Sequence, residues 1–137
     1  MVEKVCNLWI EPAVWRCIPT AGATNDEGAA ILDAGVAKEA ADRFHALDLD
    51  LGRLLTSRGN HVHEIRPGLL SFPIKQYRWS GVSLQTIERS VNELIEKVGD
   101  AKTLLPRPPL GPNDPSWEDV AKVLTALPDN VIVIEHR

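Results

Sequence analysis

The segment SLQTIERSVNELIEKVGDAKTLL, residues 83 to 105, predicts a long amphipathic helix followed directly by a strand. Apolar residues recur there at helical spacing and form one wide stripe opposite the charged residues, namely Leu84, Ile87, Val91, Leu94, Ile95 and Val98. Ser83 is a suitable N-terminal cap, and Gly99 is a suitable end signal. AKTLL, residues 101 to 105, then predicts a short buried strand.

Strands and helices alternate on both sides of this unit. HVHEIR and GLLSFPI, residues 61 to 66 and 68 to 74, predict a pair of strands. After a Pro-rich loop, Asp114 and Pro115 are expected to cap and open a helix. VIVIE, residues 131 to 135, is an uninterrupted apolar run that indicates a strand covered on both faces. This alternation predicts an α/β fold, a three-layer α/β/α sandwich around a mixed sheet.

The first half of the chain has weaker signals. Residues 2 to 6 and 13 to 18 predict two strands joined by a turn at Glu11 and Pro12. Helical spacing of apolar residues then predicts a helix from about Gly35 and a second, short one that ends at Gly59. The expected order of elements is ββααββαβαβ.

Composition limits the classes of function. A chain of 137 residues with 44% hydrophobic and 25% charged residues fits a single domain, residues 1–137. The net charge of -4 gives no basic field for long nucleic acids, although Lys75, Arg78 and Arg89 can form a local patch. Cys6 and Cys17 are expected to be reduced core thiols. Without a signal-peptide pattern or a membrane span, we expect a cytoplasmic monomer that does not contact membranes.

Two loops that precede helices are candidates for binding phosphate. One is PTAGATNDEGAAILDAGVAK, residues 19 to 38, and the other is PRPPLGPNDPSW, residues 106 to 117. Such loops offer backbone N–H groups and a helix dipole to an anion. The alternative is that their glycines only form turns and a helix start. The sequence has neither GxxxxGK[ST] nor a complete GxGxxG, which argues against a nucleoside triphosphatase or a dinucleotide dehydrogenase.

Five segments together resemble the macrodomain family. They are NLW at 7 to 9, IPTAG at 18 to 22, AGVAKEAADRF at 34 to 44, FPIKQYRW at 72 to 79 and LPRPPLGPNDPSWEDV at 105 to 120. Their order matches the family, and the branch they most resemble contains small bacterial and phage proteins and DNA-ADP-ribosylation antitoxins. The resemblance implies an ADP-ribose site between the two loops, with the diphosphate held by backbone amides near Gly22, Gly35 and Gly111.

The resemblance also implies a set of ligand-binding positions. They are Asn7, Leu8, Thr20, Ala21, Gly22, Asp33, Gly35, Val36, Pro109, Leu110, Gly111 and Asn113. Some depart from the family's pattern. Ala21 replaces an asparagine that contacts the distal ribose, Asp33 replaces a glycine, and Pro109 removes an N–H. Asn7 stands where an acid often recognises adenine, and its carbonyl can still accept from an amino group.

Lys75 and Asp114 are the candidate catalytic residues. The resemblance implicates the lysine that ends FPIK as the nucleophile, and an amine can attack an anomeric carbon or an opened sugar aldehyde. The alternative for Lys75 is a solvated lysine at a strand end. The family's assisting aspartate aligns with Asn113, so the adjoining Asp114 is either a catalytic acid or, as its local sequence favours, a helix cap.

These observations predict a protein that binds ADP-ribose or a related nucleotide and removes ADP-ribose from a modified protein or nucleic acid. The alternative is a degenerate macrodomain that acts as a non-catalytic interaction module or binds another metabolite. No cofactor is implied. His61 and His63 share one face of a predicted strand without a third ligand nearby, so we expect surface histidines and no metal site.

Overall fold

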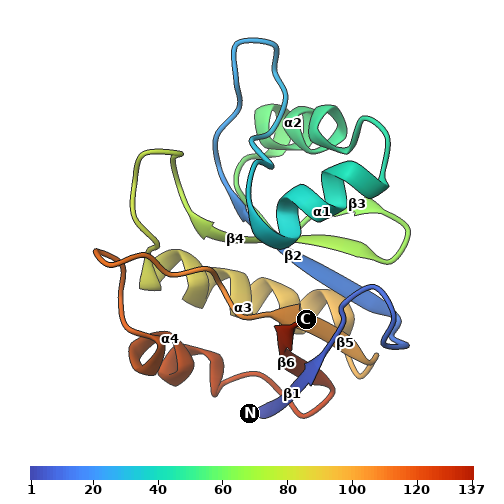
Figure 1. The fold of residues 1–137 in the computed structure, drawn as a ribbon, viewed down its shortest axis with the longest axis vertical. Coiled ribbons are helices and arrows are strands. Elements are labelled where there is room, and N and C mark those ends of the chain that lie inside the picture. Colours follow the sequence, from blue (N-terminus) through green and yellow to red (C-terminus); the bar gives the residue numbers. More distant parts are fainter.

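The computed structural model describes residues 1–137 as a six-stranded sheet with helices on both faces (Figure 1). The strands are β1 (Val2–Cys6), β2 (Trp15–Ala21), β3 (Glu64–Arg66), β4 (Leu69–Lys75), β5 (Thr103–Pro106) and β6 (Val131–His136). The helices are α1 (Gly35–Arg43), α2 (Leu47–Arg58), α3 (Leu84–Val98) and α4 (Trp117–Leu124). Their order along the chain is the predicted one.

The strands lie in the order β1-β6-β5-β2-β4-β3. Every neighbouring pair is parallel except β3 and β4, which form the predicted antiparallel pair, so the sheet is mixed. β6 lies between β1 and β5, which confirms the inner position predicted from its apolar run. Because five strands run in one direction, their carboxyl ends meet at one edge of the sheet.

β1 and β2 are not neighbours in the sheet. The chain turns after β1, where the Ile10 and Glu11 amides donate to the Asn7 carbonyl, and then enters the middle of the sheet. β6 and β5 separate the two strands. Since a turn signal fixes only local direction, it could not show that β1 pairs with the last strand of the chain.

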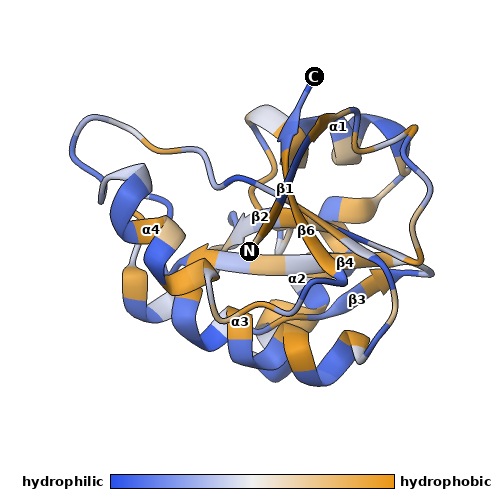
Figure 2. Cartoon of the chain, turned by 90° about the horizontal axis from the view of Figure 1, so that it is seen from below, coloured by the Kyte–Doolittle hydropathy of each residue, from blue (hydrophilic) through white to orange (hydrophobic).

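Two hydrophobic clusters hold the layers together. In Figure 1, α1 and α2 lie above the sheet and α3 and α4 lie below it. Side chains alternate between the two faces along β2, so that Cys17 packs toward α3 and α4 while Ile18 packs toward α1 and α2. Figure 2 shows the hydrophobic and hydrophilic stripes of α3, and its hydrophobic residues belong to the larger cluster.

The starts of α3 and α4 test the predicted caps. Ser83 caps α3 as predicted, since its Oγ accepts from the Thr86 amide at 3.2 Å. The prediction for α4 is wrong by two residues. Ser116, and not Asp114, is the cap, and its Oγ accepts from the Asp119 amide at 3.1 Å. Asp114 is used elsewhere, because its carboxylate binds two amides of neighbouring loops.

The two cysteines are free thiols that differ in burial. Cys17 is a buried free thiol whose pKa is raised by burial, whereas Cys6 is free but only partly buried.

His61 and His63 lie just before β3 and not in it, which corrects their predicted place on a strand. His61 Nδ1 lies 2.7 Å from Glu93 Oε2. No cluster of three potential ligand side chains for a metal is present. None of the four helices combines the length and the apolar character needed to cross a membrane.

Candidate functional site

A cleft opens at the carboxyl ends of β2 and β5. The helix that follows β2 covers one face of the sheet and the helix that follows β5 covers the other, so these neighbouring strands form a topological switch point. Two adjoining cavities lie here and share the lining residues Pro19, Ala34, Ala37 and Pro109. We name them the His136 pocket, of about 320 Å³, and the Lys75 pocket, of about 140 Å³.

The start of α1 forms the wall common to both pockets. The N-cap residue is Ala34, which has no side chain that could bind the first amides of the helix. Gly35 has a φ of 57°, a conformation that favours glycine. The first backbone bond of the helix is donated by Lys38 to the Ala34 carbonyl. The amides of Gly35, Val36 and Ala37 therefore have no partner in the protein and are available to an anion.

Lys75 enters the smaller pocket from the end of β4. Its Nζ donates to the Arg78 carbonyl at 3.2 Å, and the side chain is partly exposed. The Arg78 guanidinium in turn lies 3.2 Å from Asp33 Oδ2, which lines the same pocket. This ion pair gives Asp33 a positive partner, so its carboxylate is not an isolated negative charge in the pocket.

Asp114 joins the two loops that border the Lys75 pocket. Its Oδ2 accepts from the Gly111 amide at 2.7 Å and its Oδ1 accepts from the Val82 amide at 2.9 Å. These two hydrogen bonds, with the charge of Lys75 as a smaller cause, hold the pKa of the Asp114 carboxyl below its ordinary value. Asp114 is therefore a carboxylate at neutral pH, with one oxygen bound to each loop.

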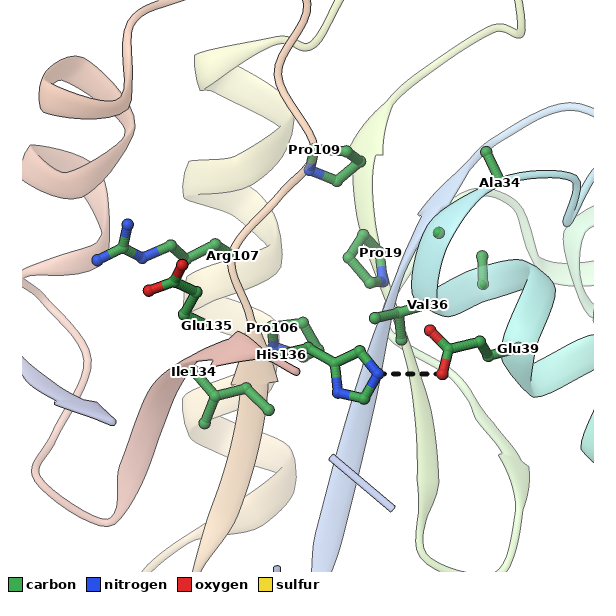
Figure 3. A pocket seen from close by; sticks show the side chains of 12 residues that line it. Pro19, Ala34, Val36, Glu39, Pro106, Arg107, Pro109, Ile134, Glu135 and His136 are labelled. Atoms are coloured by element: carbon green, nitrogen blue, oxygen red, sulfur yellow. Dashed lines mark hydrogen bonds and ion pairs between the residues drawn. The ribbon is translucent and has the colours of Figure 1, made fainter. Parts of the chain in front are cut away.

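The far end of the cleft is built around His136 (Figure 3). His136 Nδ1 accepts from the Leu8 amide at 3.0 Å, which leaves Nε2 as the protonated nitrogen that faces Glu39 Oε1, also at 3.0 Å. The same carboxylate oxygen accepts from Trp9 Nε1 at 3.2 Å. The contact with His136 is the main cause that lowers the pKa of Glu39, so an ionised carboxylate lies in this pocket.

The structure brings most of the predicted site residues to this cleft. Those that line one or both pockets are Thr20, Ala21, Asp33, Gly35, Val36, Lys75, Pro109 and Asp114. Those outside the two linings are Asn7, Leu8, Gly22, Leu110, Gly111 and Asn113. Thr20 is almost fully buried, and its hydroxyl has no hydrogen-bond partner.

Several of the residues outside the linings use their polar groups within the protein. The Gly22 amide donates to the Lys75 carbonyl at 3.1 Å, and the Gly111 amide donates to Asp114. Asn7 Oδ1 accepts from the Trp9 amide at 2.9 Å, and Leu8 is fully buried. The diphosphate contacts predicted for the Gly22 and Gly111 amides and the adenine contact predicted for Asn7 therefore meet groups that are already bonded. Only tertiary structure reveals these bonds.

Glu39 and His136 are residues that the sequence analysis missed. Glu39 sits within a helix that the sequence predicts, where a glutamate is an ordinary surface residue. His136 had a usable signal, because it ends an inner parallel strand and ligands bind at the carboxyl ends of such strands. Strand ends, and not only glycine loops, therefore indicate this site.

Comparison with known proteins agrees with the geometry. No protein-family profile and no curated protein sequence matches the chain. Among solved structures, the macrodomain of Thermus aquaticus DarG matches with a TM-score of 0.76 at 16% identity, over 100% of this chain and 98% of that one. The macrodomain of Mycobacterium tuberculosis DarG matches with a TM-score of 0.78 at 16% identity, over 99% and 97%. The chain has the macrodomain fold.

A third solved structure supports the same assignment. A macrodomain protein from Streptomyces coelicolor matches with a TM-score of 0.63 at 15% identity, over the full length of both chains. The predicted α/β/α architecture is thus confirmed. The cleft of this chain lies at the switch point between β2 and β5, bordered by the open start of α1.

Proposed function

We propose that the cleft of this macrodomain binds ADP-ribose or a related nucleotide. The observation that carries this proposal is the open start of α1, whose three unpartnered amides lie between two pockets. A diphosphate bound there would accept hydrogen bonds from Gly35, Val36 and Ala37 and would lie at the positive end of the helix dipole. Together the pockets suit a ligand with a group on each side of a diphosphate.

The carboxylates of the cleft are compatible with an anionic ligand because each has a partner. Asp33 pairs with Arg78, Glu39 accepts from His136 and Trp9, and Glu135 pairs with Arg137 at 3.0 Å. These partners offset part of the negative potential that the carboxylates would produce at the start of α1. Lys75 adds an amine whose only protein partner is a carbonyl, and Arg107 lines the rim of the larger pocket.

In this arrangement the two halves of the ligand occupy different pockets. The distal ribose would lie in the Lys75 pocket beside Thr20, whose buried hydroxyl has no protein partner. The nucleoside would lie in the larger His136 pocket, where the free Oε2 of Glu39 can accept a hydrogen bond from a base amino group. Glu39 then takes the part that the sequence analysis gave to Asn7.

We further propose that Lys75 removes ADP-ribose from a modified protein or nucleic acid. The neutral amine attacks the anomeric carbon of the distal ribose, and the bond from that carbon to the macromolecule breaks. The proton released from the new ammonium passes to the leaving group. Water then attacks the same carbon, which releases ADP-ribose and restores the amine, so that one water is consumed per cycle.

Asp114 has a positioning role in this proposal. An ionised carboxylate that already accepts from two amides is a poor proton donor, so we do not assign it as the acid. It holds the Val82 and Gly111 loops together around Lys75, and its negative charge lies near the amine. Asp114→Asn is expected to change the position of these loops. It should therefore lower turnover by a larger factor than it lowers the affinity for ADP-ribose.

A non-catalytic binder of another metabolite is the second candidate. The observation that favours it is the internal use of the Gly22 and Gly111 amides, which leaves the diphosphate fewer donors than the sequence predicts. Ala21 also lacks the side-chain amide of the asparagine that it replaces, which would contact the distal ribose. Under this alternative, α1 would still bind an anion, but ADP-ribose would have no preference over other phosphates.

The test combines binding with turnover. We expect Lys75→Ala to abolish release of ADP-ribose from ester-linked, thymidine-linked or phosphate-linked substrates and to leave calorimetric binding of ADP-ribose nearly unchanged. Lys75→Arg should be equally inactive, because a guanidinium stays protonated and cannot be a nucleophile. Lys102→Ala, which removes a surface lysine paired with Glu11, is the matched control and should retain full turnover.

Turnover and binding can fail separately. Wild-type protein that binds ADP-ribose but releases none from any of the three substrate types would overturn the hydrolase proposal alone. Lys75→Arg that keeps most of the wild-type turnover would instead show that Lys75 acts only through its charge. Equal affinity for ADP-ribose and inorganic pyrophosphate would favour the second candidate.

A further inference from the structure

A separate groove lies at the opposite edge of the sheet from the cleft. It has a volume of about 560 Å³ and is lined by Trp9, Val14, Arg16, Arg43, Phe44 and Leu69, among others. It lies beside the amino-terminal ends of β2 and β4 and the last turn of α1, whereas the cleft lies at the carboxyl ends of the strands. The groove shares no lining residue with either pocket of the cleft.

Arg16 holds its guanidinium rigidly in this groove. Its Nε donates to the Leu8 carbonyl at 2.8 Å and one terminal nitrogen donates to the Glu11 carbonyl at 2.7 Å. The other terminal nitrogen lies 3.4 Å from the Ala13 carbonyl. All three acceptors are neutral, and Arg16 forms no salt bridge. Because a guanidinium has five N–H bonds, two remain for a ligand, together with the full positive charge.

Arg43 brings a second unpaired charge to the same groove. Its guanidinium carbon lies 4.7 Å from the centre of the Trp9 ring, and it forms no salt bridge. Arg107 makes a similar contact with Trp117 at 4.4 Å, but it also pairs with Glu3 at 3.0 Å. Neither guanidinium group in the groove forms a salt bridge, although the charge of Arg43 also acts on Glu39 of the same helix.

The rest of the groove is apolar. The ring centres of Trp9 and Phe44 are 6.2 Å apart, and the two rings form one wall together with the side chain of Arg43. The volume is in the range of small-molecule sites, roughly 300–1,000 Å³. A ligand that fits needs an apolar, planar part to contact these rings and one anionic group to reach the two arginines.

We propose that this groove, which we name the Arg16–Arg43 groove, is a second ligand site for a small aromatic molecule that carries a carboxylate or phosphate group. The anion lies between the two guanidinium groups and the ring lies against Trp9 and Phe44. The proposal does not depend on the function of the cleft, because no lining residue is shared and no bound nucleotide is required.

Trp9 offers a direct readout of binding. Its indole N–H donates to Glu39, and Trp9 lines the groove, so an aromatic ring bound beside it shifts the indole resonance in a proton–nitrogen correlation spectrum. The resonance is assigned by its loss in Trp9→Phe. The probes are phenyl phosphate and benzoate, with benzyl alcohol as the neutral probe of similar size. We expect saturable shifts with millimolar affinity for both anions, since probes of about ten heavy atoms bind weakly.

Two arginine variants locate the site. Arg43→Gln should weaken phenyl phosphate binding about tenfold, as expected for loss of a charge-assisted hydrogen bond, and Arg43→Lys should restore part of it. Arg107→Gln is the matched control, because it also removes an arginine from a tryptophan face but lies at the cleft. It should leave the shifts unchanged, and saturating ADP-ribose should not compete with the probe.

Three results would overturn the proposal. The first is the absence of a shift at the Trp9 indole at tens of millimolar phenyl phosphate. The second is competition by ADP-ribose or a loss of binding in Arg107→Gln, either of which would place the probe in the cleft. The third is benzyl alcohol that binds as tightly as benzoate, because the two arginines would then contribute nothing to binding.

Discussion

The starts of α1 and α3 differ although both helices begin at the same edge of the sheet. Ser83 precedes α3, and its hydroxyl binds an amide of the first turn, whereas Ala34 precedes α1 and leaves the first amides without partners. α2 also lacks a side-chain cap, but Asp48 and Asp50 in its first turn compensate the helix dipole. α1 has no acidic residue there. The first amides of α1 are therefore available to an external anion, whereas those of α3 are partly used by its cap.

The largest expected effect comes from placing a carboxylate at the open start. Gly35→Glu should abolish ADP-ribose binding in a calorimetric titration. A like charge about 4 Å from the diphosphate costs about 4 kcal/mol at an effective dielectric constant of about 20, which is close to a thousandfold in affinity. Affinity within threefold of wild type would show that the ligand does not lie at α1.

Gly99→Glu controls for backbone strain in this experiment. Gly99 follows α3 and has a φ of 55°, and a Cβ at Gly99 or at Gly35 would meet no other atom within 4 Å. Both substitutions therefore cost roughly the same 1–2 kcal/mol of strain in the left-handed region. Gly99→Glu should lower stability more than Gly35→Glu, because its carboxylate lies at the negative end of α3, but should leave ADP-ribose affinity unchanged.

A moderate effect is expected when α1 is given a cap of its own. Ala34→Asp should stabilise the protein by about 1 kcal/mol, because the new carboxylate can accept from the free amides, and should weaken ADP-ribose binding about tenfold by competing for them. Thermal unfolding and calorimetry measure the two quantities. A variant that is more stable and binds ADP-ribose as tightly as wild type would contradict the ligand role of α1.

Ser83→Ala is the opposite experiment on α3. It should destabilise the protein by about 1 kcal/mol through loss of the cap and should not change ADP-ribose affinity. The two substitutions together separate a helix start that stabilises the fold from one that is available to a ligand.

The sequence predicted those features that depend on local pattern. The stripe and cap of α3 are fixed by residues within one segment, and the inner position of β6 follows from its apolar run, so both were found. The fold class followed from the alternation of such elements. The cap of α4 was misplaced because Asp114 and Ser116 are equally suitable caps in sequence, and only the contacts of Asp114 with Val82 and Gly111 decide between them.

The candidate site was predictable only in part. Lys75, Asp33 and Gly35 line the cleft because Lys75 ends β4, Gly35 begins α1 and Asp33 lies just before α1. The occupied amides of Gly22 and Gly111 depend on contacts between distant loops, which a motif does not encode. Gly22 is a glycine for a different reason from phosphate binding, since a Cβ there would lie 2.6 Å from the Gln76 carbonyl oxygen.

A stability effect as small as that of Ser83→Ala is expected for the residue that the sequence placed at the start of α4. Asp114→Asn should lower the free energy of unfolding by about 1 kcal/mol at pH 7, because the asparagine oxygen can accept from only one of the two loop N–H groups and the other then faces an NH2 donor. The folded-state pKa of Asp114 is lowered, so its stabilisation is present above the unfolded value of about 3.9 and is lost as pH falls through the folded value.

Urea unfolding at pH 7 and pH 3 tests this pH dependence. The difference between wild type and Asp114→Asn should shrink at pH 3, where the wild-type carboxyl begins to take up its proton. Asp129→Asn, in an exposed turn before β6, is the matched control and should show no difference at either pH. A difference for Asp114→Asn that is the same at pH 7 and pH 3 would contradict a role for the ionised carboxylate.

Calorimetric titration of the wild-type protein with ADP-ribose tests the central claim most directly. If the open start of α1 holds a diphosphate between the two pockets, the titration gives a dissociation constant near the micromolar level, or about 8 kcal/mol of binding free energy. The absence of both heat and a thermal shift at millimolar ADP-ribose would contradict the account.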